Sequence, residues 1–230
     1  MLEQLKAEVC EANLELVRRG LVTLTWGNVS AINQDRDLVV IKPSGVSYEE
    51  MRPEHMVVVD PAGKVVEGDL RPSSDTASHV LLYKHFGGIG GVTHTHSCRA
   101  TAFAQARVEL PCFGTTHADH FCGPVPVTRP LTPEEVESAY EANTGRVIVE
   151  RFAQLEPLDM PAVLVAGHAP FTWGRNAAEA VKNAVALEAV AEIAIATMAI
   201  RADAPNLENY VLEKHYRRKH GENAYYGQKG

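Results

Sequence analysis

The sequence predicts one α/β domain spanning residues 1–230, with a central, mostly antiparallel or mixed β-sheet flanked by helices. Short β-branched and apolar runs alternate with segments of helical periodicity, as in α/β domains. The alternation is too irregular for a series of βαβ units, which favours antiparallel or mixed pairing. No repeat, low-complexity run or Pro/Ser-rich linker divides the chain, and 230 residues suit one large domain.

The first part of the chain is predicted to form one helix followed by strands. Apolar residues recur at helical spacing over residues 2–16, and Gly20 supplies a stop. β-Branched and apolar runs separated by turn residues then predict strands over residues 21–25, 29–32, 38–41 and 56–59. The turn sequence Asp-Pro-Ala-Gly at residues 60–63 predicts a hairpin between the last of these strands and residues 65–66.

Helices dominate the prediction for the rest of the chain. A helix over residues 76–86 follows three candidate N-cap residues, Ser73, Ser74 and Asp75. Thr132 and Glu135 match a capping box, with Pro at the first helical position. The other expected elements are strands over residues 91–96 and 162–166 and helices over residues 99–106, 132–143, 147–155 and 177–201.

The composition argues against several classes of function. Lys and Arg number 22 against 29 Asp and Glu, and a net charge of −7 disfavours binding to nucleic-acid phosphates or to an anionic membrane. Glu188 and Glu192 interrupt the most apolar stretch, residues 184–200, which argues against a membrane-spanning helix. The four cysteines form no C-x-x-C pair, and acidic residues stand where a signal peptide would be apolar. We therefore expect a cytoplasmic protein.

The pair His94 and His96 is the most informative sign of a metal site. Residues two apart on a strand point to one face, so both imidazoles can reach a single ion. Asp75 at a predicted helix start and His168 in a loop after a predicted strand extend the set. Three imidazoles and a carboxylate, without cysteine, suit a catalytic zinc or similar divalent ion. The alternative is that the two histidines are ordinary polar residues of a strand.

Three short polar segments suggest an anion site. They are residues 27–28, residues 42–45 and residues 73–74, with the sequences Gly-Asn, Lys-Pro-Ser-Gly and Ser-Ser. Glycine lets the backbone approach a phosphate closely, and a helix N-terminus favours negative charge. Simple turn chemistry is the alternative for each segment. Neither of the common glycine-rich nucleotide motifs is present, so a nucleotide site is not predicted.

Two further clusters leave alternatives open. Asp119 follows His117 in a predicted loop, where an aspartate is either a solvated turn residue or part of a site. Near the C-terminus, four basic residues lie among two histidines: Lys214, His215, Arg217, Arg218, Lys219 and His220. They suit a solvated helix face, a tail against an acidic neighbour, or a phosphate-contacting tail followed by Tyr225 and Tyr226 as proton donors.

Taken together, these segments resemble the class II aldolase/epimerase family over residues 1–227. The resemblance rests on residues 27–30, 42–45, 73–75, 94–97 and 115–119 and on His168. Residues 23–30 (Thr-Leu-Thr-Trp-Gly-Asn-Val-Ser), residues 215–221 and residues 224–227 resemble the epimerase branch in particular. The family's aldolases have Glu where this chain has Asp75, and the shorter side chain suits a ligand better than a base, which also favours epimerase.

The resemblance also implies roles for individual residues. It implies one Zn²⁺ per subunit, or another divalent ion such as Mn²⁺, held by Asp75, His94, His96 and His168. It implies a substrate-phosphate pocket formed by Gly27, Asn28, Ser44, Gly45, Ser73 and Ser74, with Lys42 beside it. Asp119 and Tyr226 match the two catalytic acid/base residues, and the supporting positions match Thr115, Glu141, His215 and Arg218.

The resemblance implies an activity and an assembly. The activity is interconversion of L-ribulose 5-phosphate and D-xylulose 5-phosphate at C4, by cleavage and re-formation of the C3–C4 bond, in pentose catabolism of the L-arabinose type. The assembly is a homotetramer in which residues 214–230 cross to a neighbouring subunit, where Tyr226 completes the site. The alternatives are an aldolase that releases both fragments, an epimerase of another pentose pathway, a sugar-phosphate-binding protein with a vestigial metal, and a structural zinc protein.

Overall fold

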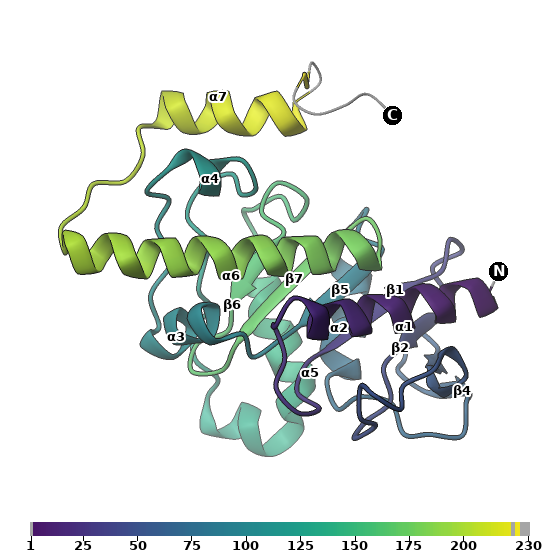
Figure 1. Cartoon of the computed structure of the whole chain (residues 1–230). Helices are drawn as coiled ribbons and strands as arrows, with labels where there is room; N and C mark the ends of the chain where they lie inside the picture. Colours follow the sequence, from purple (N-terminus) through teal and green to yellow (C-terminus); the bar gives the residue numbers. More distant parts are fainter. Residues whose placement is uncertain (1, 222–223, 226–230) are drawn as a thin grey trace.

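A single antiparallel β-sheet lies at the centre of the computed structural model, which describes residues 2–221 and 224–225 (Figure 1). Within these residues, seven strands follow the order β4-β3-β2-β1-β5-β7-β6, and every neighbouring pair is antiparallel. The strands are β1 (Asn28–Ile32), β2 (Val39–Ile41), β3 (Val57–Val59), β4 (Val65–Glu67), β5 (Gly91–His94), β6 (Ala162–Leu164) and β7 (Pro170–Gly174). The predicted fold class is therefore confirmed.

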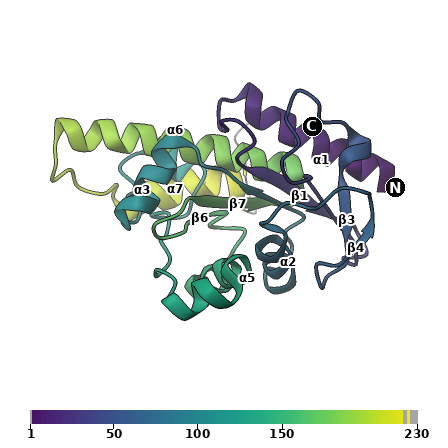
Figure 2. The same ribbon diagram turned by 90° about the horizontal axis from the view of Figure 1, so that it is seen from below.

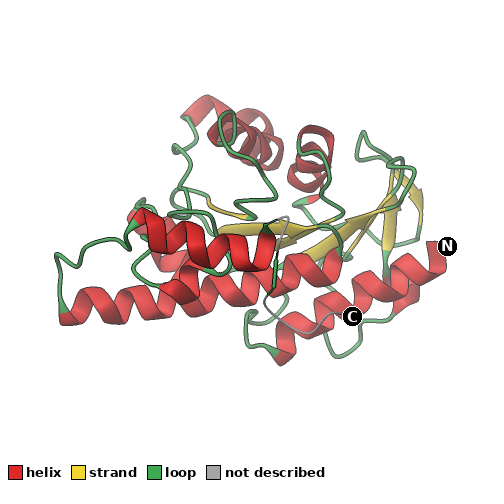
Figure 3. Cartoon of the chain, turned by 90° about the horizontal axis from the view of Figure 1, so that it is seen from above, coloured by secondary structure: helices red, strands yellow, loops and turns green. Residues whose placement is uncertain are grey.

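Helices cover both faces of this sheet. They are α1 (Leu2–Arg18), α2 (Thr76–His85), α3 (Cys98–Ala106), α4 (Thr115–Ala118), α5 (Pro133–Arg151), α6 (Ala177–Ile200) and α7 (Asn209–His220), with the short 3₁₀ helix η1 (Pro53–His55). Helices α2 and α5 pack together on one face, and α1 and α6 lie on the other (Figures 2 and 3). Because both faces are covered, the strands read as apolar runs rather than as strict alternation.

The middle strands bury side chains on both sides of the sheet. On β2, Val39 and Ile41 join the hydrophobic core that contains Leu82 of α2. Val40, between them, joins the core that contains Val9 of α1. Successive strand residues point to opposite faces, so the three-residue strand supplies both cores and ties the two helical layers together.

The register of the central strands brings several loops to one edge of the sheet. Asn28 at the start of β1 pairs with His94 at the end of β5, and His94 in turn pairs with Phe171 near the start of β7. Ile41 at the end of β2 pairs with Ser30 on β1, which places the loop after β2 at the same edge. The residues before β1, after β2, after β5 and before β7 therefore meet there.

Several predicted elements differ from the structure in detail. Residues 21–25 form no strand, and Leu24 there has a left-handed φ of 54°. Strand β5 ends at His94, so His96 lies in the following loop. The helices predicted over residues 132–143 and 147–155 are one helix, α5, interrupted at Ala139. Strand β7 has no counterpart among the predicted strands, because it begins with Pro and ends with Gly, which the pattern assigns to turns.

Helix α6 is long and apolar enough, by length and composition, to cross a membrane. In this fold, however, Leu187 and Ala191 are buried in the core between the helix and the sheet. Glu188, one of the acids that interrupt the apolar stretch, accepts hydrogen bonds from the backbone N–H groups of Arg99 (2.9 Å) and Ala100 (3.0 Å) at the start of α3. The acid therefore caps a neighbouring helix, where a negative charge is favourable.

We expect Gly91→Ala to destabilise the protein by about 3 kcal/mol, as overpacking against a rigid neighbour does. A methyl group at Gly91 in β5 would overlap the carbonyl carbon and oxygen of Asn176, which are backbone atoms and cannot rotate away. Chemical denaturation measures the free energy of unfolding. The matched control is Gly87→Ala in the turn after α2, where the added methyl meets nothing within 4 Å. Equal stability of both variants would contradict the packing of α6 onto β5.

Candidate metal and anion site

Three histidines gather at the edge of the sheet where the central strands meet. The ring centroid of His94 lies 4.9 Å from that of His96 and 4.9 Å from that of His168, and the last two lie 5.1 Å apart. One possible ligand atom from each ring lies within 4.8 Å of the others. Although His96 lies just beyond β5, the structure brings together the three imidazoles that the sequence proposed as ligands.

His94 is oriented by its surroundings. Its Nδ1 lies 2.9 Å from the carbonyl oxygen of Pro170, and its ring stacks on Phe171 with centroids 4.2 Å apart. A carbonyl oxygen only accepts, so Nδ1 carries the proton and Nε2 presents its lone pair. A hydrogen bond from the ring nitrogen that does not bind the metal is the usual support of a metal-binding histidine.

Burial favours the neutral form of two of the three imidazoles, those of His96 and His168. Burial, followed by the proximity of His94 and His96, lowers the pKa of His168 to about 4. Burial also lowers the pKa of His96. In addition, Nδ1 of His168 is buried without a hydrogen-bond partner among the described residues. Metal ligation requires neutral imidazole, so this donor set fits a divalent ion such as Zn²⁺.

Asp75 lies beside the histidines but outside the cluster of atoms within 4.8 Å. Its Oδ2 accepts a hydrogen bond of 2.6 Å from Nδ2 of Asn28. Burial would raise the pKa of Asp75, but attraction to His94 and the neighbouring imidazoles, with the hydrogen bond from Asn28, outweighs burial and lowers it. The carboxylate is therefore ionised and is placed as a fourth ligand or as the orienting partner of Asn28.

A cavity of about 570 Å³ joins these residues to the three polar segments singled out in the sequence. Its walls include the metal-site residues and the predicted phosphate pocket: Gly27, Asn28, Lys42, Ser44, Gly45, Ser73, Ser74, Asp75, His94, His96 and His168. The volume is typical of a small-molecule site. The predicted metal ligands and the predicted phosphate pocket therefore share one cavity.

The anion side of this cavity is built from two paired loops. Ser44 donates its backbone N–H to the carbonyl of Arg71, and Ser73 donates to the carbonyl of Lys42, both at 2.9 Å. Gly27 is required beside them, because its φ is 86° and a Cβ there would lie 2.9 Å from the carbonyl oxygen of His94. The two loops thus surround this side of the cavity with small side chains, which leave room for a ligand.

Lys42 is a buried cation in this wall. Its side chain is nearly inaccessible, and among the described residues Nζ donates to the carbonyl of Pro43, at 3.3 Å, and lies 5.0 Å from the centroid of the Tyr48 ring. No carboxylate of the described residues forms an ion pair with it, and burial lowers its pKa. A buried ammonium group without a counter-ion is stabilised by an anion that enters the cavity.

The predicted residues around Asp119 form a separate cluster, between α4 and α7. The Asp119 carboxylate accepts hydrogen bonds from Arg218 (2.8 and 3.1 Å) and His215 (3.1 Å) and forms an ion pair with Lys219 (3.3 Å). Burial opposes ionisation, but these hydrogen bonds outweigh it and lower the pKa of Asp119. Of the predicted supporting residues, Glu141 lines the metal cavity, whereas Thr115, His215 and Arg218 do not. Tyr226 lies outside the described residues.

Two histidines left without a role in the sequence now have partners. His117 on α4 is buried, and its Nε2 lies 2.8 Å from the carbonyl oxygen of Gly123. His220 on α7 lies with its Nε2 3.0 Å from the carbonyl oxygen of Asp119. The first contact is local to α4 and the residues after it, the second joins α7 to the end of α4, and neither residue lines the metal cavity.

The structure adds two aromatic residues that the sequence did not single out as site residues. Trp26 lines the cavity with its ring centroid 6.2 Å from that of His96, and Tyr140 lines it with its centroid 6.0 Å from that of His168. Trp26 lies in the loop before β1, and Tyr140 precedes Glu141 on α5. Trp26 is close to Asn28 in the sequence and Tyr140 is next to Glu141, but closeness in sequence does not indicate which way an aromatic ring points.

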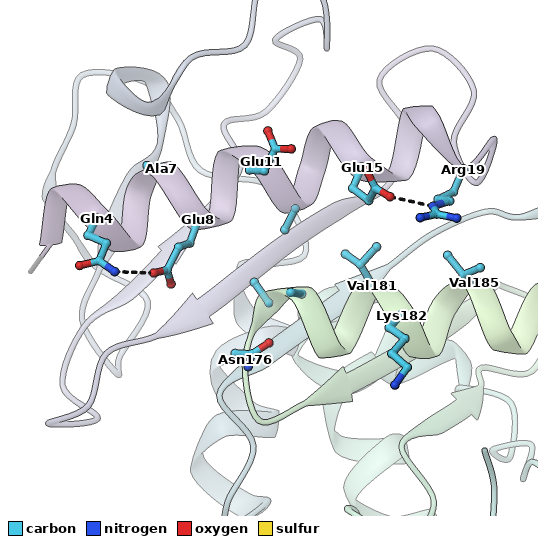
Figure 4. A pocket seen from close by; sticks show the side chains of 13 residues that line it. Gln4, Ala7, Glu8, Glu11, Glu15, Arg19, Asn176, Val181, Lys182 and Val185 are labelled. Atoms are coloured by element: carbon cyan, nitrogen blue, oxygen red, sulfur yellow. Dashed lines mark hydrogen bonds and ion pairs between the residues drawn. The ribbon is translucent and has the colours of Figure 1, made fainter. Parts of the chain in front are cut away.

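A larger groove, of about 930 Å³, runs between α1 and α6 (Figure 4). Its acidic side chains come from α1, and part of its polar lining is paired internally, as Gln4 donates to Glu8 (2.9 Å) and Arg19 to Glu15 (2.7 Å). Its lining within the described residues contains no histidine or cysteine. The smaller cavity at the sheet edge, which the three clustered histidines line, is therefore the candidate metal site.

Comparison with known proteins relates this arrangement to one family. The family model described as class II aldolase and adducin N-terminal domain matches residues 7–195. Among solved structures, an L-fuculose 1-phosphate aldolase is 26% identical with a TM-score of 0.79, covering 94% of this chain and 95% of that one. YgbL from Klebsiella pneumoniae is 25% identical, with a TM-score of 0.72 and coverage of 93% and 98%. L-Fuculose-1-phosphate aldolase from Thermus thermophilus, at 23% identity, a TM-score of 0.70 and coverage of 88% and 99%, shares the fold.

We expect His96→Ala to weaken zinc affinity by more than about 100-fold, since the loss of a direct ligand exceeds the 10- to 100-fold cost of losing a supporting residue. Titration calorimetry of metal-free protein measures the affinity, and metal analysis after dialysis gives the occupancy. The control is His85→Ala on the exposed end of α2, which is outside the cluster. Unchanged affinity in the His96 variant would contradict the three-histidine site.

Proposed function

Because the chain belongs to the class II aldolase and adducin family, we propose that it is a metal-dependent L-ribulose-5-phosphate 4-epimerase of the cytoplasm. The observation that carries the proposal is the cavity itself. It joins a three-histidine cluster to a buried Lys42 that lacks a counter-ion among the described residues, with Asn28 and the paired loops beside them. A site of this kind suits a ligand that bears both metal-chelating oxygens and a phosphate.

The chemistry of the substrate explains why such a site is needed. The C4 hydrogen of a 2-ketopentose 5-phosphate is not adjacent to the carbonyl, so simple deprotonation cannot invert C4. Inversion requires that the C3–C4 bond break, that the aldehyde of the released glycolaldehyde phosphate turn over, and that the bond form again. When bound, a divalent ion supplies Lewis-acid stabilisation of the negative charge that develops on the keto fragment.

The residues of the chain hold the fragments during this sequence. Lys42 and the paired loops retain the phosphate while the aldehyde rotates, so the fragment stays in place for recombination. The C4 hydroxyl gives its proton to one residue before cleavage and receives a proton from another after recombination on the opposite face. We assign these two roles to Asp119 and Tyr226, one on each side of the C4 oxygen.

The position of Asp119 supports an assembly in which sites form between subunits. Asp119, Arg218 and His215 lie together between α4 and α7, and none of them lines the metal cavity of their own chain. In a homotetramer with cyclic symmetry, each α4 and α7 can face the cavity of a neighbouring subunit. We propose this arrangement, with residues 214–230 completing the neighbour's site and Tyr226 as part of it.

A metal-dependent aldolase is the second candidate, favoured by the 26% identity to an L-fuculose 1-phosphate aldolase. It would use the same cavity and the same bond cleavage but would release both fragments. The resemblance that links Asp75, rather than Glu, to the epimerase branch favours the first candidate.

The proposed activity predicts that zinc-loaded protein converts L-ribulose 5-phosphate to D-xylulose 5-phosphate. A chelator should abolish conversion and added Zn²⁺ or Mn²⁺ should restore it, because three clustered imidazoles line the cavity and can hold a divalent ion. A coupled assay for D-xylulose 5-phosphate gives the rate, and a trap for free aldehyde detects glycolaldehyde phosphate. Free aldehyde in place of the epimer would support the aldolase, and no conversion by metal-loaded tetramer would overturn the epimerase.

The proposed assembly predicts that Asp119 is supplied by a neighbouring subunit. Asp119→Asn should lower kcat by about 10²- to 10⁴-fold with metal content unchanged, as expected for a proton-transfer residue. Mixing Asp119→Asn with His96→Ala subunits by unfolding and refolding should restore about one quarter of the wild-type activity, because a neighbour can then supply the intact carboxylate. The control is Asp203→Asn, whose exposed carboxylate pairs with Arg201. Full kcat in the Asp119 variant would refute its role, and no recovery on mixing would refute the shared site.

A further inference from the structure

Helix α5 is interrupted at the point where it meets the cavity. Ala139 has φ −162° and ψ 72°, an extended conformation within the helix Pro133–Arg151. The next two residues, Tyr140 and Glu141, both line the cavity. An uninterrupted helix turns 100° per residue and would direct consecutive side chains to different sides. The interruption therefore changes which side chains α5 presents to the cavity.

Specific hydrogen bonds hold this interruption. Nδ2 of Asn143 donates to the carbonyl of Glu135 (2.7 Å), which bridges the two parts of the helix. Oγ1 of Thr144 donates to the carbonyl of Tyr140 (2.9 Å), and Oγ of Ser78 on α2 donates to the carbonyl of Glu141 (2.5 Å). These bonds fix the backbone of Tyr140 and Glu141, and so fix the point on α5 from which the Tyr140 side chain enters the cavity.

The order of the strands gives the cavity a direction. Lys42 follows β2, Asn28 begins β1, His94 ends β5 and His168 precedes β7, and these strands are neighbours in that order. Neighbouring strands lie about 4.8 Å apart, so the backbone of Lys42 and the backbone of His168 lie at opposite ends of this row of four strands. The Tyr140 ring lies 6.0 Å from that of His168, at an interplanar angle of 47°. Tyr140 is therefore a neighbour of His168, at the end of the row of strands opposite to the Lys42 loop.

The hydroxyl of Tyr140 is available and protonated. About a third of the residue is exposed, and no side chain among the described residues forms a hydrogen bond with its hydroxyl. Burial, together with the negative charges of Asp75 and Glu141, raises the pKa of Tyr140. A neutral phenol both donates and accepts, which suits an alcohol group of a ligand.

We propose that Tyr140 determines specificity for the unphosphorylated end of the substrate, by a hydrogen bond between its hydroxyl and the terminal C1 hydroxyl group. The proposal rests on the proposed function, since it takes the ligand to be a 2-ketose phosphate with its phosphate on the Lys42 side. The metal-chelating oxygens of the substrate then lie between its two ends. Tyr140 contacts the one functional group beyond them, the C1 hydroxyl. It is a binding residue and takes no part in proton transfer at C4.

A cycle that changes the protein and the ligand together tests this contact. The proteins are wild type and Tyr140→Phe, which removes only the hydroxyl, and the ligands are L-ribulose 5-phosphate and its 1-deoxy analogue, which has a terminal methyl group. Wild type should prefer the hydroxyl ligand by roughly 2- to 12-fold in Kd and in kcat/KM, the usual effect of one neutral hydrogen bond. The preference should vanish in Tyr140→Phe, with the change mainly in KM. All measurements are made at saturating zinc, with metal content and circular dichroism recorded for each protein.

The control and the outcomes separate this inference from the proposed function. Tyr210→Phe, on the exposed side of α7, should keep the wild-type preference. If wild type epimerises the substrate but Tyr140→Phe keeps the same preference, the Tyr140 contact is overturned and the epimerase stands. If wild type binds both ligands without epimerising either, the epimerase is overturned, and the ratio of Kd values still decides the contact. If wild type binds neither ligand, both proposals are overturned.

Discussion

The cavity depends on the register between β1, β5 and β7, in which Asn28 pairs with His94 and His94 with Phe171. This register brings the start of one strand, the end of the next and the start of the third to the same edge of the sheet. A slip of one residue would turn every side chain of β5 to the opposite face and would move His94 away from His168. The close approach of α6 to Gly91 at the other end of β5 leaves no room for such a slip.

This edge carries polar groups that the chain leaves partly uncompensated. Lys42 is buried without a carboxylate partner among the described residues, and a ring nitrogen of His168 is buried there without a hydrogen bond. By contrast, the buried hydroxyl of Ser30 on β1 is satisfied by His79 (2.7 Å) and Tyr83 (2.8 Å). Groups left unsatisfied at a cost to stability are typical of sites that are completed by a ligand.

Much of the fold and of the metal cluster followed from local pattern. The long helices α1 and α6 and the capping box of α5 rest on periodicity and on neighbours within one turn, and the structure has them. His94 and His96 were correctly predicted to lie side by side, although His96 lies beyond the end of the strand. Strand β7 was missed, because its pairing with β5 and not its own composition makes it a strand.

The sequence by itself determined which chemical groups the protein has, and the tertiary structure decided which of them act together. Spacing along the chain is enough for His94 and His96, since the backbone links them within a few ångströms. It is not enough for Tyr140, whose place in the cavity depends on an interruption of α5 held by Asn143 and by contact with α2. Nor is it enough for Asp119, whose hydrogen-bond partners His215 and Arg218 come from the distant helix α7 and which does not line the metal cavity of its own chain. Such contacts join residues that are distant in sequence, and their free energy comes from packing and charge pairing that local propensity does not contain.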